Sequence, residues 1–213
     1  MTDRALKEKI FFICQECGYK SLKWQGRCPD CDNWNSFVEE VVSEQPRRDR
    51  VRELSVVEPR AISEIEPSKE IRFGCGIEEL DRILGGGIVA GSVILVGGDP
   101  GIGKSTLLLQ VSDALSKDGK VVLYVSGEES VRQTKLRAER LGVGSKSLYV
   151  LSETSLSVIV ELIKRIKPSA VVIDSIQVLC SDNISSSAGS VSQVRECAGE
   201  LVLLAKNSSI PMF

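Results

Sequence analysis

This 213-residue chain contains the glycine-rich segment Gly98-Asp-Pro-Gly-Ile-Gly-Lys-Ser105. It matches the pattern G-x-x-x-x-G-K-[ST], with an apolar segment before it and an amphipathic segment after it. Glycines let successive backbone N–H groups turn toward one anion, and a following helix adds the positive end of its dipole. A glycine-rich turn with a chance lysine is the alternative, but it leaves the flanking strand and helix patterns unexplained. The stretch therefore predicts a loop that binds the phosphates of ATP.

The loop and the residue after it are assigned to nucleotide binding: Gly98, Asp99, Pro100, Gly101, Ile102, Gly103, Lys104, Ser105 and Thr106. Lys104 is expected to reach the β- and γ-phosphates and to take part in catalysis. The hydroxyl of Ser105 is expected to bind Mg²⁺.

On both sides of the loop, short apolar stretches alternate with amphipathic ones. We expect strands at 92–96, 121–126, 147–151 and 170–173, and helices at 104–115, 129–141, 156–166 and 191–206. In the last helix an apolar stripe is expected from Val191, Val194, Ala198, Leu201 and Ala205. The alternation of strand and helix predicts an α/β fold with a mostly parallel sheet covered on both faces.

Two acidic residues follow expected strands. Asp174 ends the apolar stretch at 170–173, a Walker B arrangement, and is expected to hold Mg²⁺ with Ser105. Alone, such an aspartate more often caps the next turn, but the phosphate loop upstream favours the metal role. Glu128 follows the strand at 121–126 and is expected to orient the water that attacks the γ-phosphate. The alternative is that Glu128 and Glu129 only favour a helix dipole, a role that suits Glu129 better.

Four of the seven cysteines have the spacing of a metal site, Cys14-x-x-Cys17 and Cys28-x-x-Cys31. Two such knuckles can complete a tetrahedron of thiolates, so we expect structural Zn²⁺ rather than a redox pair or an iron–sulfur cluster. The other three cysteines are interpreted as small buried residues: Cys75, Cys180 and Cys197.

Composition narrows the functions further. The chain has no histidine, which excludes a Ser-His or Cys-His catalytic pair and histidine metal ligands. A net charge of −2 argues against a uniformly basic nucleic-acid binder, so any such surface is local. Trp24 and Trp34, near Lys20, Lys23 and Arg27, could contact single-stranded nucleic acid or could simply cover the zinc knuckles.

The expected organisation is a four-cysteine zinc finger at 10–38, a linker at 39–68 and a nucleotide-binding domain at 69–213. The linker is proline-punctuated, with one short strand expected near 54–57. It carries an arginine run that usually marks a solvated segment: Arg47, Arg48, Arg50 and Arg52. We find no apolar run of membrane-spanning length and no secretory signal, and we expect a cytoplasmic protein without a membrane partner.

Taken in order, these motifs resemble the bacterial RadA family, also called Sms, from about residue 10 to the end. The segments that carry the resemblance are CQECGY (14–19), KWQGRCPDC (23–31), WN (34–35), GGDPGIGKSTLLLQ (97–110), YVSGEES (124–130), VIDSIQ (172–177) and GSVSQVRE (189–196). The family also carries a Lys-Asn-Arg-Phe-Gly motif and a Lon-protease-like domain, which this sequence lacks. With the apolar stretch at 210–213, which looks like the start of a strand, this leads us to expect an N-terminal fragment.

The resemblance implies a RecA-like P-loop ATPase core behind a rubredoxin-like zinc module, with ATP, Mg²⁺ and Zn²⁺ as cofactors. It implies a DNA-dependent ATPase of recombinational repair that drives branch migration, with Glu128 as the catalytic glutamate. The implied partners are single-stranded or branched DNA, a RecA-type recombinase and further copies in a ring. The alternatives are a RecA-like regulatory module, of the branch that includes clock proteins, and a non-catalytic zinc-finger interaction platform. Gln177 and Gln193 could sense the γ-phosphate or DNA.

Overall fold

The computed structural model describes residues 8–43, 61–64 and 72–213. The chain divides into two compact units, and the larger comprises Ile71–Asp182 and Ser187–Phe213. The arginine run, most of the expected linker and the strand expected near 54–57 lie outside the described residues.

The N-terminal unit contains a small antiparallel sheet. Its strands are β1 (Glu8–Cys14), β2 (Lys20–Ser21) and β3 (Phe37–Ser43), in the order β2-β1-β3. Cys14 lies opposite Phe37 at the end of the β1–β3 ladder. β3 continues beyond residue 38, where we expected the zinc finger to end, because all seven of its residues pair with β1.

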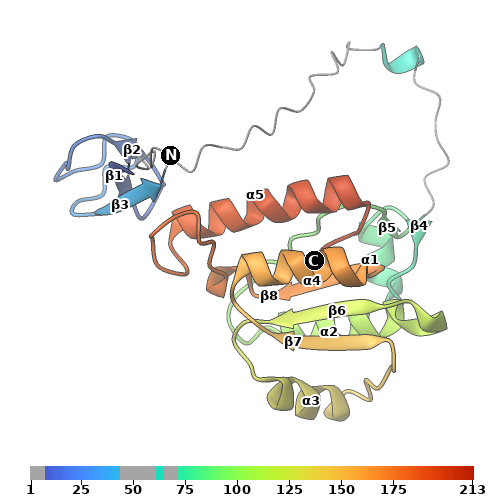
Figure 1. Ribbon diagram of the computed structural model, residues 1–213. Helices are drawn as coiled ribbons and strands as arrows, with labels where there is room; N and C mark the ends of the chain where they lie inside the picture. Colours follow the sequence, from blue (N-terminus) through green and yellow to red (C-terminus); the bar gives the residue numbers. More distant parts are fainter. Residues whose placement is uncertain (1–7, 44–60, 65–71) are drawn as a thin grey trace, which may run out of the picture. The chain divides into compact units, whose positions relative to one another are not determined.

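The larger unit is built on a parallel sheet, as the alternating pattern predicts. Its strands are β6 (Val122–Ser126), β7 (Leu148–Ser152) and β8 (Ala170–Asp174), in the order β7-β6-β8 (Figure 1). All five residues of β6 are buried, whereas β7 is half exposed because it has only one neighbour among the described strands. The strands run in register, so their carboxyl ends meet at one edge.

Helices cover both faces of this sheet, and the side chains of each strand alternate between them. Leu123 and Val171 pack against α4 (Leu156–Ile166) and α5 (Val191–Ser208). Tyr124 and Val172 pack on the opposite face against α2 (Lys104–Leu115). A further helix, α3 (Val131–Arg140), lies beside the edge strand β7 (Figure 1). The α/β, RecA-like architecture is confirmed.

The segment expected to be a strand at 92–96 pairs at one point only. Val93 forms a parallel bridge with Met212, and Met212 bridges to Val171 of β8 on its other side. The expected strand start at 210–213 therefore adds to the sheet, as its apolar pattern indicates. The described residues contain no full strand at 92–96, so that prediction was wrong.

The buried stripe of α5 differs from the expected one. The buried residues are Gln193, Cys197, Leu201 and Ala205. Val191, Val194 and Ala198 are only partly buried. The difference arises because the Gln193 side-chain amide makes two hydrogen bonds with the backbone of Ser181. Its Oε1 accepts from Ser181 N–H at 2.9 Å, and its Nε2 donates to Ser181 O at 3.3 Å. Satisfied in this way, a polar residue can occupy a core position.

Some boundaries and short elements differ from the expected ones. α3 begins two residues later than expected because Ser130 forms a capping box with Gln133. The sequence pattern did not predict α1 (Glu78–Ile83) or the hairpin of β4 (Arg72–Phe73) and β5 (Ile88–Val89). Three 3₁₀ turns complete the elements of the part of the chain that the structure describes: η1 (Ile62–Glu64), η2 (Lys117–Gly119) and η3 (Ile176–Val178).

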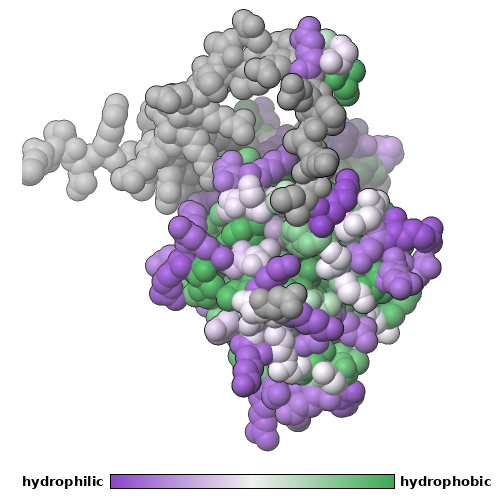
Figure 2. Space-filling model, turned by 90° about the vertical axis from the view of Figure 1, so that its right-hand side faces the viewer, coloured by the Kyte–Doolittle hydropathy of each residue, from purple (hydrophilic) through white to green (hydrophobic). Residues whose placement is uncertain are grey.

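The surface is chemically mixed. Figure 2 shows hydrophobic residues scattered among hydrophilic ones on the viewed face of the larger unit. Among the described residues, no helix is long and apolar enough to cross a membrane.

Candidate functional site

The glycine loop ends at a helix whose first turn has no side-chain cap. Gly101 and Gly103 have φ angles of 81° and 105°, a left-handed conformation that favours glycine. Gly103 is the N-cap of α2 and has no side chain to satisfy the first N–H groups. By contrast, Ser130 and Ser190 cap α3 and α5 through their hydroxyls. The α2 terminus is therefore left open to bind an anion.

Lys104 lies across the loop that precedes it. Its Nζ donates to the carbonyl oxygens of Gly98 at 2.7 Å and Asp99 at 2.8 Å. The ammonium is thus held at the loop by weakly basic backbone groups, which phosphate oxygens can replace with stronger, charge-assisted hydrogen bonds.

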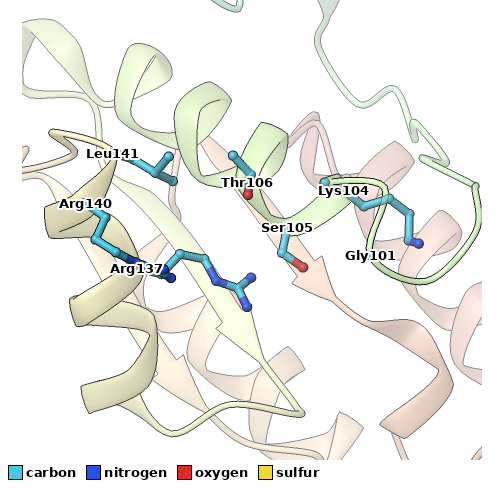
Figure 3. A pocket seen from close by; sticks show the side chains of 8 residues that line it. Gly101, Lys104, Ser105, Thr106, Arg137, Arg140 and Leu141 are labelled. Carbon is cyan, nitrogen blue, oxygen red and sulfur yellow. The ribbon is translucent and has the colours of Figure 1, made fainter.

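A cavity of about 450 Å³ opens at the loop (Figure 3). Five of the predicted nucleotide-binding residues line it: Gly101, Gly103, Lys104, Ser105 and Thr106. The other lining residues come from α3 and the residue after it: Arg137, Arg140 and Leu141. Gly98, Asp99, Pro100, Ile102, Glu128 and Asp174 are not among the lining residues. The volume is in the range of small-molecule sites.

The two predicted acids lie at the ends of adjacent strands. Ser126, the last residue of β6, pairs with Asp174, the last residue of β8, and Gly127 N–H donates to Asp174 O at 2.9 Å. One residue further, Glu128 Oε1 accepts a hydrogen bond from the hydroxyl of Ser175 at 2.8 Å. The register of the sheet thus brings Glu128 and Asp174 together at its carboxyl edge, the edge where open α/β sheets bind ligands.

Asp174 is held by a buried tyrosine that sequence reasoning missed. The hydroxyl of Tyr124 donates to Asp174 Oδ2 at 2.5 Å, and Tyr124 is 1% exposed. Burial, and after it the Asp174 carboxylate, raise the pKa of Tyr124 well above its usual value. The phenol therefore stays protonated and keeps donating at any physiological pH. This bond holds the carboxylate by one of its two oxygens.

The backbone before Glu128 is tightly enclosed. A Cβ placed on Gly127 would lie 2.1 Å from Cγ2 of Val178, so no larger residue fits without movement. Glu129 points elsewhere: its carboxylate pairs with the guanidinium of Arg137, and its N–H donates to Ser126 Oγ at 3.0 Å. Glu129 precedes the N-cap of α3, so its carboxylate serves an ion pair rather than the helix dipole alone.

The four predicted metal ligands come together in the N-terminal unit. Two knuckles repeat one hydrogen-bond pattern: Cys14 N–H donates to Tyr19 O, and Cys28 N–H donates to Asn33 O, both at 2.9 Å. The sulfur atoms of Cys14 and Cys31 are 3.6 Å apart, as are those of Cys17 and Cys28, and all four lie within 4.8 Å of one another. Zn–S bonds of about 2.3 Å in a tetrahedron place sulfurs about 3.8 Å apart. The cluster therefore fits structural zinc.

Phenylalanines, not the tryptophans, cover the knuckles. Phe37 is buried against Cys14 and Cys28, and Phe12 packs on the same cluster. Trp24 and Trp34 are 56% and 70% exposed, so they do not cover the metal site. Both rings are accessible to a partner, as the alternative role in nucleic-acid binding requires.

Replacing Cys28 by serine is expected to remove about one zinc ion per chain and to unfold the N-terminal unit. So small a module has little hydrophobic core, and metal binding supplies its folding free energy. Elemental analysis gives the zinc content, and limited proteolysis of residues 8–43 reports folding. Cys180→Ser, outside the cluster, is the matched control and should keep its zinc. A finger that stays folded without metal contradicts the assignment.

The remaining cysteines are not suited to bind metal. Burial raises the pKa of the Cys75 and Cys197 thiols to about 11, so both stay protonated. Cys180 is half-buried, and the four-cysteine cluster is the only group of potential metal ligands found among the described residues. Gln193 is 2% exposed and bound to Ser181, which removes it as a sensor of nucleotide or DNA. Gln177 is exposed.

Arg137 and Arg140 are the main residues that sequence reasoning missed. They lie three residues apart on a helix expected from the sequence, so the pattern places them on one face. The contact of Tyr124 could also have been predicted, because Tyr124 lies in an expected buried strand and a buried tyrosine hydroxyl usually has a hydrogen-bond partner.

Comparison with known protein families assigns a class to each unit. A family model described as an AAA domain matches residues 59–207, and one described as a rubredoxin metal binding domain matches residues 12–39. The first match covers more than half of the chain. The chain therefore belongs to the AAA domain family, with a rubredoxin-type metal-binding module before it.

The similar curated proteins are bacterial DNA repair proteins named RadA. That of Bacillus subtilis is 53% identical over 97% of this chain, that of Listeria monocytogenes 52% and that of Aquifex aeolicus 48% over the same share. The predicted resemblance to RadA is confirmed. The chain spans 46% of the length of each of these relatives.

Proposed function

We propose that this chain is the zinc-finger and nucleotide-binding part of an ATP-dependent DNA repair protein that hydrolyses ATP to drive branch migration. One observation carries the ATPase assignment. Val93 and Val171 of β8 both bridge Met212 in parallel, so the phosphate loop and the uncapped start of α2 follow their strand-like segment at the carboxyl edge of the sheet, the edge where Glu128 and Asp174 lie. Backbone donors, a cation and carboxylates are the groups that phosphoryl transfer to water requires.

In this proposal the loop residues 98–106 bind the triphosphate. The open N–H groups of the first turn of α2 hold phosphate oxygens, and Lys104 exchanges its two carbonyl partners for the β- and γ-phosphates. As negative charge develops on the transferring phosphoryl group, the fixed ammonium stabilises it without reorganisation.

Magnesium fits the residues at this edge. Ser105 is the second residue of α2 and carries a hydroxyl. The Asp174 carboxylate, whose Oδ2 is held by Tyr124, offers Oδ1, and both groups are hard oxygen donors. When bound, Mg²⁺ would neutralise charge on the β- and γ-phosphates. Glu128 takes the proton of the attacking water, and its hydrogen bond from Ser175 places the carboxylate before substrate arrives.

DNA contact is proposed from the relatives and from the exposed aromatic residues of the finger. The curated relatives are named as DNA repair proteins. Trp24 and Trp34 flank Gly26, and the guanidinium of Arg27 lies 5.9 Å from the centre of the Trp34 ring. Exposed rings beside a cation can stack on the bases of single-stranded DNA. A RecA-type recombinase and further copies in a ring are proposed as partners, and the cytoplasm, where thiolate zinc sites persist, as the location.

The test measures ATP hydrolysis with and without single-stranded DNA, on this chain and on the full-length gene product. We expect single-stranded DNA to increase the turnover of the full-length protein by at least several-fold. Trp34→Ala serves as the internal comparison, because it should weaken DNA stimulation while leaving the rate without DNA unchanged.

Other outcomes favour the other readings. ATP binding with no hydrolysis in the full-length protein points to a regulatory nucleotide-binding module. Neither binding nor hydrolysis points to a zinc-finger interaction platform. A rate of ATP hydrolysis that does not change when single-stranded DNA is added contradicts the proposed repair function but leaves the ATPase assignment intact.

A further inference from the structure

The cavity at the phosphate loop extends well beyond the residues that hold phosphates. In Figure 3, Gly101 and Lys104 lie on one side of Ser105 and Thr106, and Arg137, Arg140 and Leu141 lie on the other. The phosphate chain of a nucleotide ends at the loop and the start of α2. The base and ribose must leave that end, and the cavity continues toward α3.

The α3 side of this cavity has a chemistry suited to a nucleoside. A guanidinium is planar and weakly hydrated and stacks on aromatic rings, and Leu141 adds an apolar contact. Arg140 is exposed and makes no hydrogen bond or ion pair with the described residues, so its guanidinium is available to a ligand. Two arginines and a leucine thus border the part of the cavity that the phosphates do not fill.

The second arginine is fixed in place by an acid. Arg137 pairs with the carboxylate of Glu129, and the two side chains are 25% and 29% exposed. Glu129 is anchored at its backbone on both sides, since its N–H donates to Ser126 Oγ and its carbonyl accepts from Ser152 Oγ at 3.2 Å. The pair therefore positions a guanidinium at the cavity wall and neutralises the carboxylate that would repel a nucleotide.

We propose that Arg137, Arg140 and Leu141 form the nucleoside subsite of the nucleotide site, with the base stacked on the Arg140 guanidinium and Arg137 held by Glu129 beside the ribose. This inference rests on the proposed ATP site. It adds that α3 recognises the nucleoside, while the loop and α2 recognise the phosphates.

The test compares two ligands that share phosphates and differ in the nucleoside. Binding of ATP and of inorganic tripolyphosphate, each with Mg²⁺, is measured by titration calorimetry on the chain and on Arg140→Ala. Arg132→Ala is the matched control, because Arg132 is an exposed arginine of α3 that does not line the cavity. Arg140 is exposed at the end of the helix, so its removal should leave the fold unchanged, which circular dichroism checks.

We expect Arg140→Ala to weaken ATP binding about ten-fold, the scale of one base-stacking contact, and to leave tripolyphosphate binding unchanged. Arg132→Ala should change neither. An equal loss for both ligands shows that Arg140 contacts phosphate and overturns the proposal, as does unchanged ATP binding. If the unmodified chain binds neither ligand, the ATP site itself is wrong, an outcome distinct from failure of the subsite alone.

Discussion

Replacing Glu128 by glutamine is expected to lower the rate of ATP hydrolysis by about 10² to 10⁴-fold while ATP binding changes little. The Glu128 carboxylate lies at the sheet edge and can accept a proton from water, and general bases contribute on this scale. Glutamine keeps the shape and can still accept the hydrogen bond from Ser175, so the variant removes the base without removing the contact. Single-turnover hydrolysis and ATP titration on the full-length protein separate the two effects.

The control for this prediction is Glu161→Gln, an exposed acid on α4 far along the chain from the site. It should hydrolyse ATP at the unmodified rate. Should Glu128→Gln retain normal turnover, the attacking water is activated by another group, and the role given to Glu128 is wrong.

Lys104→Ala is expected to weaken ATP binding by about a hundred-fold or more and to abolish measurable turnover. The side chain supplies the ammonium of the loop, and charge-assisted hydrogen bonds to phosphate are roughly twice as strong as neutral ones. The loss also removes the two bonds from Nζ to the carbonyls of Gly98 and Asp99, which hold the loop. Equilibrium titration with ATP and with tripolyphosphate should show the same loss for both ligands.

Lys117→Ala provides the comparison, because Lys117 is an exposed lysine just beyond the other end of α2. It should bind both ligands normally. Normal turnover in Lys104→Ala would refute the assignment of the phosphate loop to the nucleotide.

The parts of the fold that were predicted well are those whose signal is local. The bounds of α2 and α4 agree with the expected ranges 104–115 and 156–166, because glycine or serine precedes each apolar pattern. The strands β6 and β8 are also near their expected places, since continuous apolar runs are typical of strands buried on both faces. The cluster of four cysteines could be predicted from their spacing in the sequence alone.

The parts that were missed depend on distant partners. The segment at 92–96 has a strand-like pattern, but pairing depends on the neighbour, and Met212 offers a single bridge. The burial of Gln193 depends on the backbone of Ser181, which no helical periodicity reveals. In the site, Arg137 and Arg140 were not predicted because the approach of α3 to the loop is a property of the tertiary fold.

The segment that links β6 to α3 has a mechanical consequence. Gly127 is fixed by Asp174 O and enclosed by Val178, Glu129 is tied to Ser126, and Ser130 caps α3. Glu128 lies within this stretch, whose backbone is held on both sides of it. In the proposed hydrolysis, the position of the Glu128 carboxylate therefore depends on its side-chain rotamer, which the Ser175 hydroxyl holds.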